Sequence, residues 1–282
     1  MDDPGRAVAA QGPGPTPDGG DPWLAAIADV LGGGGLRLAM QPIVDLVRGV
    51  TIGYEALSRF ERPPSAPPDV WFAHAKALGL GAALDALAVH LALGLRRALP
   101  GGAFLSVNVD PAHLTDPDLT EVFRRVDTLD GLVVELTERA GVEDYDALSR
   151  RLHILRERGA RVTVDDVGSS EGGVQWLTMV APEFVRLDRS GVVGIDTDET
   201  KRAVVEMLRT FAGTIGAQVV AEGIERQEEL DALVMLGVPL GQGFLLGRPS
   251  LVDWCDVDPA ITARLQARAD RAPATHQGTV PA

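Results

Sequence analysis

The chain has 282 residues, a mass of 29.8 kDa and a hydrophobic fraction of 45%, which allows a sizeable α/β domain and excludes a wholly disordered protein. Its formal net charge of −14 and sequence pI near 4.7 exclude a basic field that would attract duplex nucleic acid or an anionic membrane. A lone Cys255 excludes an internal disulfide framework, and neither a signal sequence nor a membrane-spanning run is recognisable. We therefore expect a cytoplasmic domain.

The two ends of the chain differ in composition from its middle. Residues 1–21 are rich in Gly and Pro, and residues 264–282 turn small and polar without an apolar period. Such segments bury too little apolar surface to fold, so we expect both to be disordered tails. Residues 22–263 are expected to form the folded domain.

Short β-type runs alternate with amphipathic helical stretches across that domain, which is the pattern that builds parallel sheets. The predicted strands are Leu36–Asp45, Thr51–Ser58, Ala103–Asp110, Leu132–Leu136, Arg161–Asp165, Glu183–Asp188, Ala217–Ala221 and Gly241–Leu246. Several are apolar at successive positions, as strands covered on both faces should be. We therefore expect the helices to lie outside the sheet.

Helical spacing of apolar residues predicts helices at Tyr145–Arg158, Glu199–Ile215 and Gln227–Leu236, the second of them capped by Asp196 or Asp198. Eight strands with intervening helices match the size of an α/β fold of the (β/α)8 TIM-like barrel type. Too few residues separate the first two strands for a helical crossover. The sequence therefore predicts a barrel with an antiparallel first strand.

Carboxylates and amides recur in or just after different predicted strands. They are Glu55, Asn108, Glu135, Asp165, Asp188, Glu222 and Gln242. In such barrels the carboxyl ends of the strands converge on one mouth. Acids gathered there would repel one another unless cations neutralise them, and oxygen ligands without clustered His or Cys favour Mg²⁺ or Mn²⁺.

Asp165 and Asp166 are neighbours at the end of a predicted strand. If the strand has ended there, one carboxylate could ligate a first cation and the other a second. The alternative is a water-exposed turn or cap pair, which for these two residues alone is about as good an explanation. The other strand-end acids favour the metal site.

The order and spacing of these motifs resemble the EAL domain family of bacteria. The resemblance runs from about Leu36 to Pro249. It is carried by Gln41-Pro42-Ile43, Gly53-Tyr54-Glu55-Ala56-Leu57-Ser58-Arg59, Ser106-Val107-Asn108, Glu135-Leu136-Thr137-Glu138, Asp165-Asp166-Val167-Gly168, Ala221-Glu222-Gly223-Ile224-Glu225 and Gly241-Gln242-Gly243.

The resemblance implies a (β/α)8-like barrel that cuts cyclic di-GMP to pGpG with two Mg²⁺ or Mn²⁺ ions. It implies metal ligation by Glu55, Asn108, Glu135, Asp165 and Asp166, with Glu222 and Gln242 completing the site. It implies substrate contacts by Gln41, Leu57, Arg59 and Gln242, and catalytic roles for Glu55, Asp166, Arg186 and Glu222. Glu138 would support the loop after Asp166, and a homodimer is a further possibility.

Two departures from the family pattern affect residues to which the resemblance assigns a functional role. Arg186 stands where members usually have a lysine near the attacking water, and arginine offers charge and hydrogen bonds but does not usefully accept a proton. The loop at 167–173 also differs from the family pattern, with Gly172-Gly173 and Glu171. Both changes predict reduced phosphodiesterase activity.

Three functions are compatible with these residues. The first is metal-dependent hydrolysis of cyclic di-GMP at a reduced rate. The second is an inactive EAL domain that serves as a cyclic di-GMP receptor or a protein-interaction scaffold. The third is another barrel enzyme acting on a different phosphorylated or carboxylate substrate. Away from these motifs, the pair Arg96-Arg97 is interpreted as part of a solvated helix face.

Overall fold

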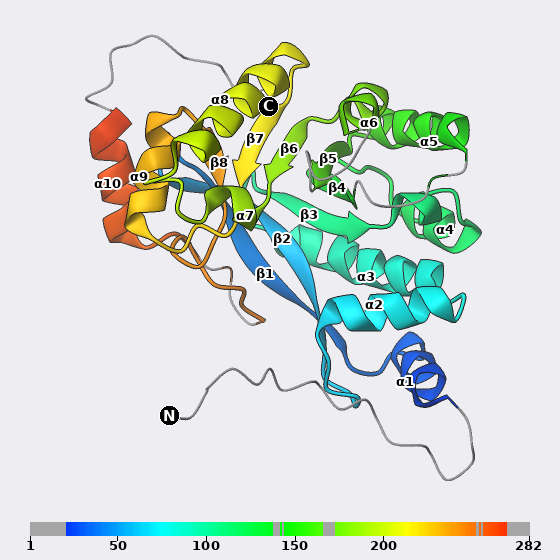
Figure 1. Cartoon of the computed structure of the whole chain (residues 1–282). Coiled ribbons are helices and arrows are strands. Elements are labelled where there is room, and N and C mark those ends of the chain that lie inside the picture. Colours follow the sequence, from blue (N-terminus) through cyan, green and yellow to red (C-terminus); the bar gives the residue numbers. More distant parts are fainter. Residues whose placement is uncertain are drawn as a thin grey trace, which may run out of the picture.

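The computed structural model describes residues 21–137, 142, 144–165, 173–251, 254 and 256–269, and it confirms the expected barrel. Eight strands are hydrogen-bonded in chain order, and the last pairs with the first to close the ring (Figure 1). The strands are β1 (Leu36–Asp45), β2 (Val50–Phe60), β3 (Phe104–Val109), β4 (Leu132–Thr137), β5 (Arg161–Asp165), β6 (Phe184–Leu187), β7 (Gln218–Ala221) and β8 (Leu240–Gly241).

The first strand runs against both of its neighbours, as the short connection predicted. β1 is antiparallel to β2 and to β8, whereas every other neighbouring pair is parallel. The turn between β1 and β2 is held by Asp45, whose carboxylate accepts hydrogen bonds from the backbone N–H groups of Val47 and Arg48 at 2.8 and 2.9 Å. Gly49 completes the turn at φ +66°, a conformation that favours glycine.

The helices lie around the outside of the ring of strands (Figure 1). They are α1 (Pro22–Leu31), α2 (Pro68–Ala77), α3 (Gly81–Leu95), α4 (Pro117–Arg124), α5 (Tyr145–Glu157), α6 (Gly173–Val180), α7 (Arg189–Val192), α8 (Glu199–Thr214), α9 (Gln227–Met235) and α10 (Pro259–Ala269), with short 3₁₀ turns η1 (Arg96–Ala98) and η2 (Pro111–His113). In the described part of the chain, no helix combines the length and the apolar character needed to cross a membrane.

Helix α8 illustrates why the helices begin where they do. The Asp198 carboxylate accepts hydrogen bonds from the N–H groups of Thr200 and Lys201, which decides between the two predicted caps. Its buried face carries Val205, Leu208 and Ala212, at helical spacing. The predicted ends of the three helices named from the sequence agree with the structure to within one residue at each end.

Two sequence predictions need correction. The last strand covers Leu240–Gly241 rather than Gly241–Leu246, because the chain turns at Gly243, whose carbonyl accepts from the N–H groups of Leu246 and Gly247. Residues 264–269, expected to belong to a disordered tail, instead continue α10 to Ala269. In that helix Leu265 is only 2% exposed. The spacing of Ile261 and Leu265 was too sparse a pattern to reveal the helix.

Side chains of the strands alternate between the barrel interior and the layer beneath the helices. The floor of the barrel is a compact apolar cluster of Ile43, Phe104, Val133, Phe184, Val220 and Leu240. Neighbouring positions such as Leu105, Val134 and Val185 belong instead to the main core beneath the helices. Polar side chains on the interior positions can therefore gather only above this apolar floor, toward the mouth.

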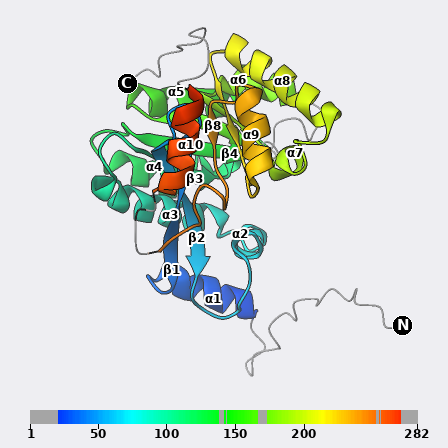
Figure 2. The same cartoon turned by 90° about the vertical axis from the view of Figure 1, so that its left-hand side faces the viewer.

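The hairpin β1–β2 extends beyond the barrel and carries a second hydrophobic core, visible at the lower end of the molecule in Figure 2. Trp23 of α1 meets Trp71 of α2 edge to face with centroids 5.2 Å apart. The ring of Phe60, the last residue of β2, stacks on Trp71 at 4.4 Å. This packing fixes the end of β2 that lies beside the mouth.

Candidate functional site

Polar residues at the mouth follow the floor residues at two-residue intervals along the strands. On β3 the interior positions run from Phe104 in the floor through Ser106 to Asn108, and on β4 they run from Val133 to Glu135. The registers place Asn108 beside Glu135 and Glu55 beside Ser106. Side chains distant in sequence therefore reach one level of the barrel.

Three carboxylates converge at this level. Oxygen atoms of Glu135 on β4, Asp165 at the end of β5 and Glu222 just after β7 all lie within 4.8 Å of one another. Carboxylate oxygens at such spacing are the donors that a hard divalent cation prefers. The donor chemistry of this acid triad therefore fits Mg²⁺ or Mn²⁺.

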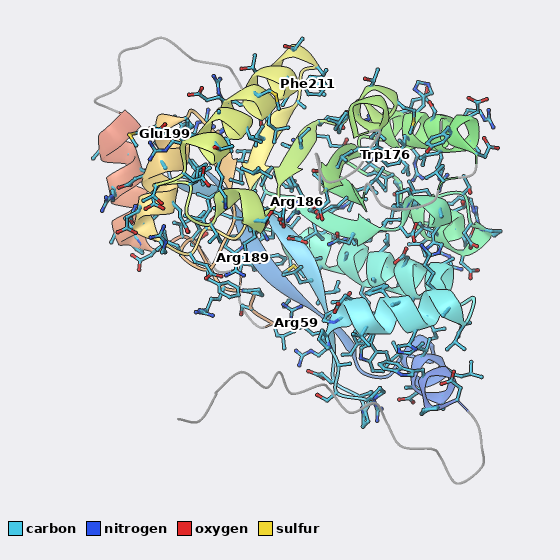
Figure 3. All side chains as sticks on the ribbon, in the orientation of Figure 1. Arg59, Trp176, Arg186, Arg189, Glu199 and Phe211 are labelled. Atoms are coloured by element: carbon cyan, nitrogen blue, oxygen red, sulfur yellow. The ribbon has the colours of Figure 1, made fainter. Side chains whose placement is uncertain are left out.

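The Arg186 guanidinium lies among these same carboxylates, near the centre of the ring of strands (Figure 3). Its Nη1 pairs with Glu135, its Nε faces Glu222 and lies 3.9 Å from Asp165, and its Nη2 donates to Glu55 at 3.0 Å. Arg186 is 4% exposed. One buried cation of the chain itself thus contacts every member of the triad.

Amides hold Glu55 in place beside the triad. Asn108 donates to Glu55 Oε1 at 2.9 Å, and Gln242 donates to Glu55 Oε2 at 2.7 Å. The Gln242 amide also donates to Gln41 Oε1 at 3.1 Å, and Gln41 donates to the carbonyl of Gly247 at 3.1 Å. Four predicted site residues therefore form one chain of hydrogen bonds.

Arg186 offsets part of the negative charge in the site. Burial alone would raise the pKa of Glu55, but Arg186 and the two amides outweigh it and lower that pKa below its usual value. Burial raises the pKa of Glu135, with Glu55 and Asp165 adding to the effect and Arg186 opposing it. Burial disfavours the charged Arg186, yet the surrounding carboxylates hold its pKa above the usual value. Arg186 is therefore a permanent cation.

A cavity of about 420 Å³ opens beside the acid triad. Asn108 belongs to its wall, as do Leu57 and Arg59 on the interior face of β2. Arg59 lies near the far end of β2 (Figure 3), where its guanidinium donates to the backbone carbonyl of Ser58 at 2.8 Å. The carboxylates of Asp85 and Asp110 also line this cavity, which the sequence analysis did not identify.

Most of the predicted site residues meet at this mouth. The structure brings together Gln41, Glu55, Asn108, Glu135, Asp165, Arg186, Glu222 and Gln242, with Leu57 and Arg59 in the adjoining cavity. Asp188 instead caps α7, where it accepts from the N–H of Ser190 at 2.8 Å. Asp166 and Glu138, like the altered loop, lie outside the described residues.

Ser106 is a site residue that sequence reasoning missed. Its hydroxyl donates to Glu135 Oε2 at 2.9 Å, and it is almost fully buried one interior position below Asn108. The two-residue alternation Phe104, Ser106, Asn108 carried this signal, because the residue between a floor aromatic and a site amide must point inward.

Comparison with known proteins gives a family match across most of the chain. The model of the EAL domain matches residues 25–249. PdeG of Escherichia coli K12, named a probable cyclic di-GMP phosphodiesterase, is 27% identical over 222 residues, covering 74% of this chain and 43% of PdeG. An uncharacterized protein of Azorhizobium caulinodans is 29% identical over 228 residues, covering 76% of this chain and 31% of its own length. The chain thus spans less than half the length of these curated relatives.

Solved structures agree with the family match. The PaMucR phosphodiesterase in complex with c-di-GMP superposes with a TM-score of 0.73 at 26% identity, covering 82% of this chain and 98% of the PaMucR chain. Klebsiella pneumoniae BlrP1 in its calcium and cy-diGMP complex gives a TM-score of 0.68 at 29% identity, covering 80% and 58% of the two chains. With the barrel, the acid triad and the family match in agreement, the chain belongs to the EAL domain family.

Proposed function

We propose that this domain binds cyclic di-GMP at its mouth and hydrolyses it to pGpG with a divalent cation, at a rate that Arg186 lowers. The observation that carries the proposal is the acid triad of Glu135, Asp165 and Glu222 at the carboxyl ends of three strands. Relatives that resemble this chain carry cyclic di-GMP phosphodiesterase names or were solved with c-di-GMP.

The cavity beside the triad supports binding of one half of the dinucleotide. Its volume of about 420 Å³ falls in the range of ligand sites. The Arg59 guanidinium would pair with a phosphate, and the partly exposed carboxylate of Asp110 would accept a hydrogen bond from a guanine edge. Leu57 supplies an apolar wall for the base.

The triad would hold the cation, with Glu55 and Asn108 beside it. A bound Mg²⁺ or Mn²⁺ would supply an activated water and relieve negative charge on the phosphoryl oxygens. Gln242 and Gln41 orient Glu55 through their amide chain, so that its carboxylate keeps one direction. In this proposal Asp166 contributes to the second ion, as the family resemblance implies.

Arg186 would weaken metal binding and slow hydrolysis, for two reasons. Its guanidinium already pairs with the carboxylates that a cation needs, so metal binding must break some of those contacts. Its raised pKa also prevents it from taking a proton from water, so it can act only by orienting groups and balancing charge. The expected consequence is weaker metal binding and slower turnover.

A turnover assay with Mn²⁺ and cyclic di-GMP tests the proposal. The natural protein should yield pGpG slowly, Arg186→Lys should be about tenfold faster or more, and Glu55→Ala should give no product above background. No product from either the natural protein or Arg186→Lys at high enzyme concentration would overturn the hydrolase.

A second function follows from the same arginine. If Arg186 keeps cations out of the triad altogether, the domain is a cyclic di-GMP receptor that binds without cutting. Calorimetry distinguishes the two, because a receptor binds cyclic di-GMP equally well with and without Mn²⁺ and releases no pGpG. Failure to bind the nucleotide under either condition would exclude both functions.

A further inference from the structure

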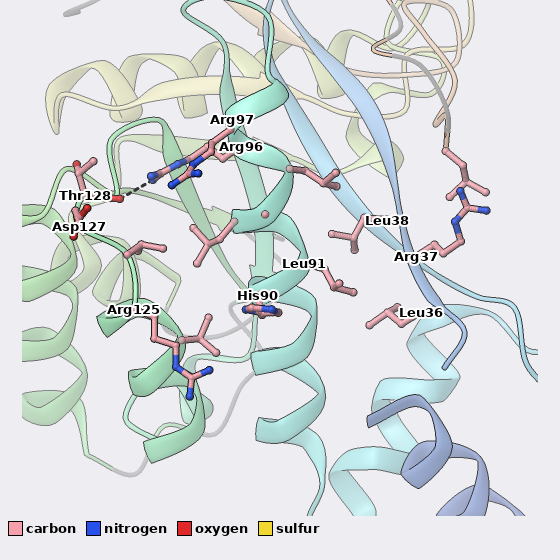
Figure 4. A pocket seen from close by; sticks show the side chains of 16 residues that line it. Leu36, Arg37, Leu38, His90, Leu91, Arg96, Arg97, Arg125, Asp127 and Thr128 are labelled. Carbon is pink, nitrogen blue, oxygen red and sulfur yellow. Dashed lines mark hydrogen bonds between the residues drawn. The ribbon is translucent and has the colours of Figure 1, made fainter. Parts of the chain in front are cut away.

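A groove lies on the outer wall of the barrel between the start of β1, the C-terminal half of α3 and the end of α4 (Figure 4). Its volume is about 810 Å³. The apolar part of its lining includes Leu36, Leu38, Leu91, Leu93, Val122 and Val126. None of its lining residues belongs to the acid triad or to the cavity beside it. The groove is therefore separate from the candidate active site.

The rim of this groove is cationic, against the charge of the whole chain. Four arginines line it, Arg37, Arg96, Arg97 and Arg125, together with His90. Asp127 is the one carboxylate among its described lining residues. In a chain of formal net charge −14, this is a local reversal of the electrostatic field.

The rim arginines are available to a ligand. Arg37 pairs with Glu61 at 3.1 Å, but the two side chains are 51% and 49% exposed. Arg125 pairs with exposed Glu121 at 3.0 Å. Such exposed pairs contribute little stability, so a ligand can replace them at small cost.

Two further rim groups are less constrained than these pairs. Arg97 and His90 make no polar contact with other described residues and are both exposed. Arg96 uses one N–H to donate to the carbonyl of Thr128 at 2.8 Å, and its other donors stay available. The pair Arg96-Arg97 thus lies on a solvent-accessible face, as interpreted from the sequence, and its free donors face the groove.

We propose that this groove binds an acidic amphipathic helix of a partner protein. The aliphatic floor suits leucine-like residues on one helix face. Cationic groups stand on two edges of this floor, with Arg96 and Arg97 in η1 and Arg125 just after α4, whereas Arg37 projects from the other side of β1 than Leu36 and Leu38 (Figure 4). A single anionic head group could pair with one edge only, whereas carboxylates flanking an apolar helix face can reach both.

The test uses a short labelled peptide with leucines at i, i+3, i+4 and i+7 and glutamates on the flanks, followed by fluorescence anisotropy. We expect saturable binding that weakens with added salt. The double variant Arg97→Glu/Arg125→Glu should bind at least tenfold more weakly, as should the natural protein with a peptide carrying lysines in place of the glutamates. Arg150→Glu, an exposed charge reversal on α5, should bind like the natural protein.

Several outcomes would overturn the proposal. Equal peptide binding by the double variant, or no saturable binding by a natural protein whose fold is verified by circular dichroism, would exclude the groove. Binding to anionic phospholipid vesicles or to an RNA oligonucleotide, lost in the double variant and without peptide binding, would assign the groove to another class of ligand. Self-association by light scattering that the double variant abolishes would make the occupant a second copy of this chain.

Discussion

The mouth of the barrel and the groove on its wall combine the same residue types in opposite proportions. At the mouth one arginine, Arg186, is buried among four carboxylates that come from separate strands. In the groove four arginines surround an aliphatic floor, and the acids that pair with Arg37 and Arg125 are exposed. Arg186 offsets only part of the negative charge at the mouth, whereas the groove leaves cationic charge for a ligand.

Burial explains why the two regions should behave differently. A buried ion pair is costly to break because the partner left behind keeps its charge without water, whereas an exposed pair is readily replaced by solvent. Substitutions at the mouth should therefore change stability and metal binding. Substitutions in the groove should change association and leave the fold intact.

The largest effect is expected from Arg186→Met, which removes the cation and leaves the carboxylates buried together. Without metal, we expect the free energy of unfolding to fall by about 3–5 kcal/mol. Mn²⁺ should restore part of this loss by replacing the missing charge. Urea denaturation with and without Mn²⁺ measures both effects. A variant as stable as the natural protein in the absence of metal would show that Arg186 does not offset the charge of the site.

A smaller effect is expected from Arg186→Lys, which keeps the charge but offers fewer hydrogen-bond donors to the triad. Because the ammonium group cannot pair with several carboxylates in the geometry of the guanidinium, the triad becomes easier for a cation to enter. We expect Mn²⁺ affinity to rise about tenfold, or about 1.4 kcal/mol, by calorimetry. Unchanged affinity would exclude competition between Arg186 and the metal.

A pH effect is expected at His113, which contacts Asp85 in the wall of the cavity beside the acid triad. Its Nδ1 lies 2.8 Å from buried Asp85 Oδ2, and this contact raises the pKa of His113 above 6.5, with Asp110 adding to the effect and burial and Lys76 opposing it. The folded state therefore binds this proton more tightly than the unfolded state. The resulting stability is present below pH 6.5 and is lost as pH rises through the higher folded-state pKa.

Denaturation at about pH 6 and about pH 8 measures this effect, because the window lies above the ordinary pKa of histidine. The natural protein should lose more stability across that interval than His113→Asn, which does not titrate. Equal pH dependence of the two proteins would show that another group is responsible.

The smallest effect on stability is expected in the groove. Arg97→Met should change the free energy of unfolding by less than about 0.5 kcal/mol, because Arg97 is exposed and makes no polar contact with other described residues. Thermal denaturation of Arg97→Met beside Arg186→Met compares the same substitution in the two environments. A comparable loss in both variants would contradict the distinction between them.

Much of the fold could be predicted from the sequence, because local patterns specify it. The short link between β1 and β2 excluded a crossover, and Asp198 lay where a helix cap was needed. β8 was misplaced because the apolar residues Phe244-Leu245-Leu246 suggest a continuing strand, whereas the backbone already turns at Gly243. A turn enforced by long-range contacts leaves no local periodic signal.

The candidate site was predictable as a list of residues but not as an arrangement. The acids were recognised because each lies in or just after a strand, and the register then brought Asn108 beside Glu135. That Arg186 points into the triad depends on which face of β6 its position occupies, and hence on Phe184 lying in the floor. The groove could not be predicted, because its arginines come from three separate elements.

The long hairpin has a consequence for the geometry of the mouth. The backbone pairing between β1 and β2 runs without a register shift from Leu36 opposite Phe60 to Gln41 opposite Glu55. Arg59 and Glu55 therefore sit on a single ribbon whose outer end is held by the stacking of Phe60 on Trp71, which Trp23 contacts in turn. A partner protein that contacted α1 and twisted this ribbon would therefore reorient the side chains of Arg59 and Glu55 together, because both project from β2.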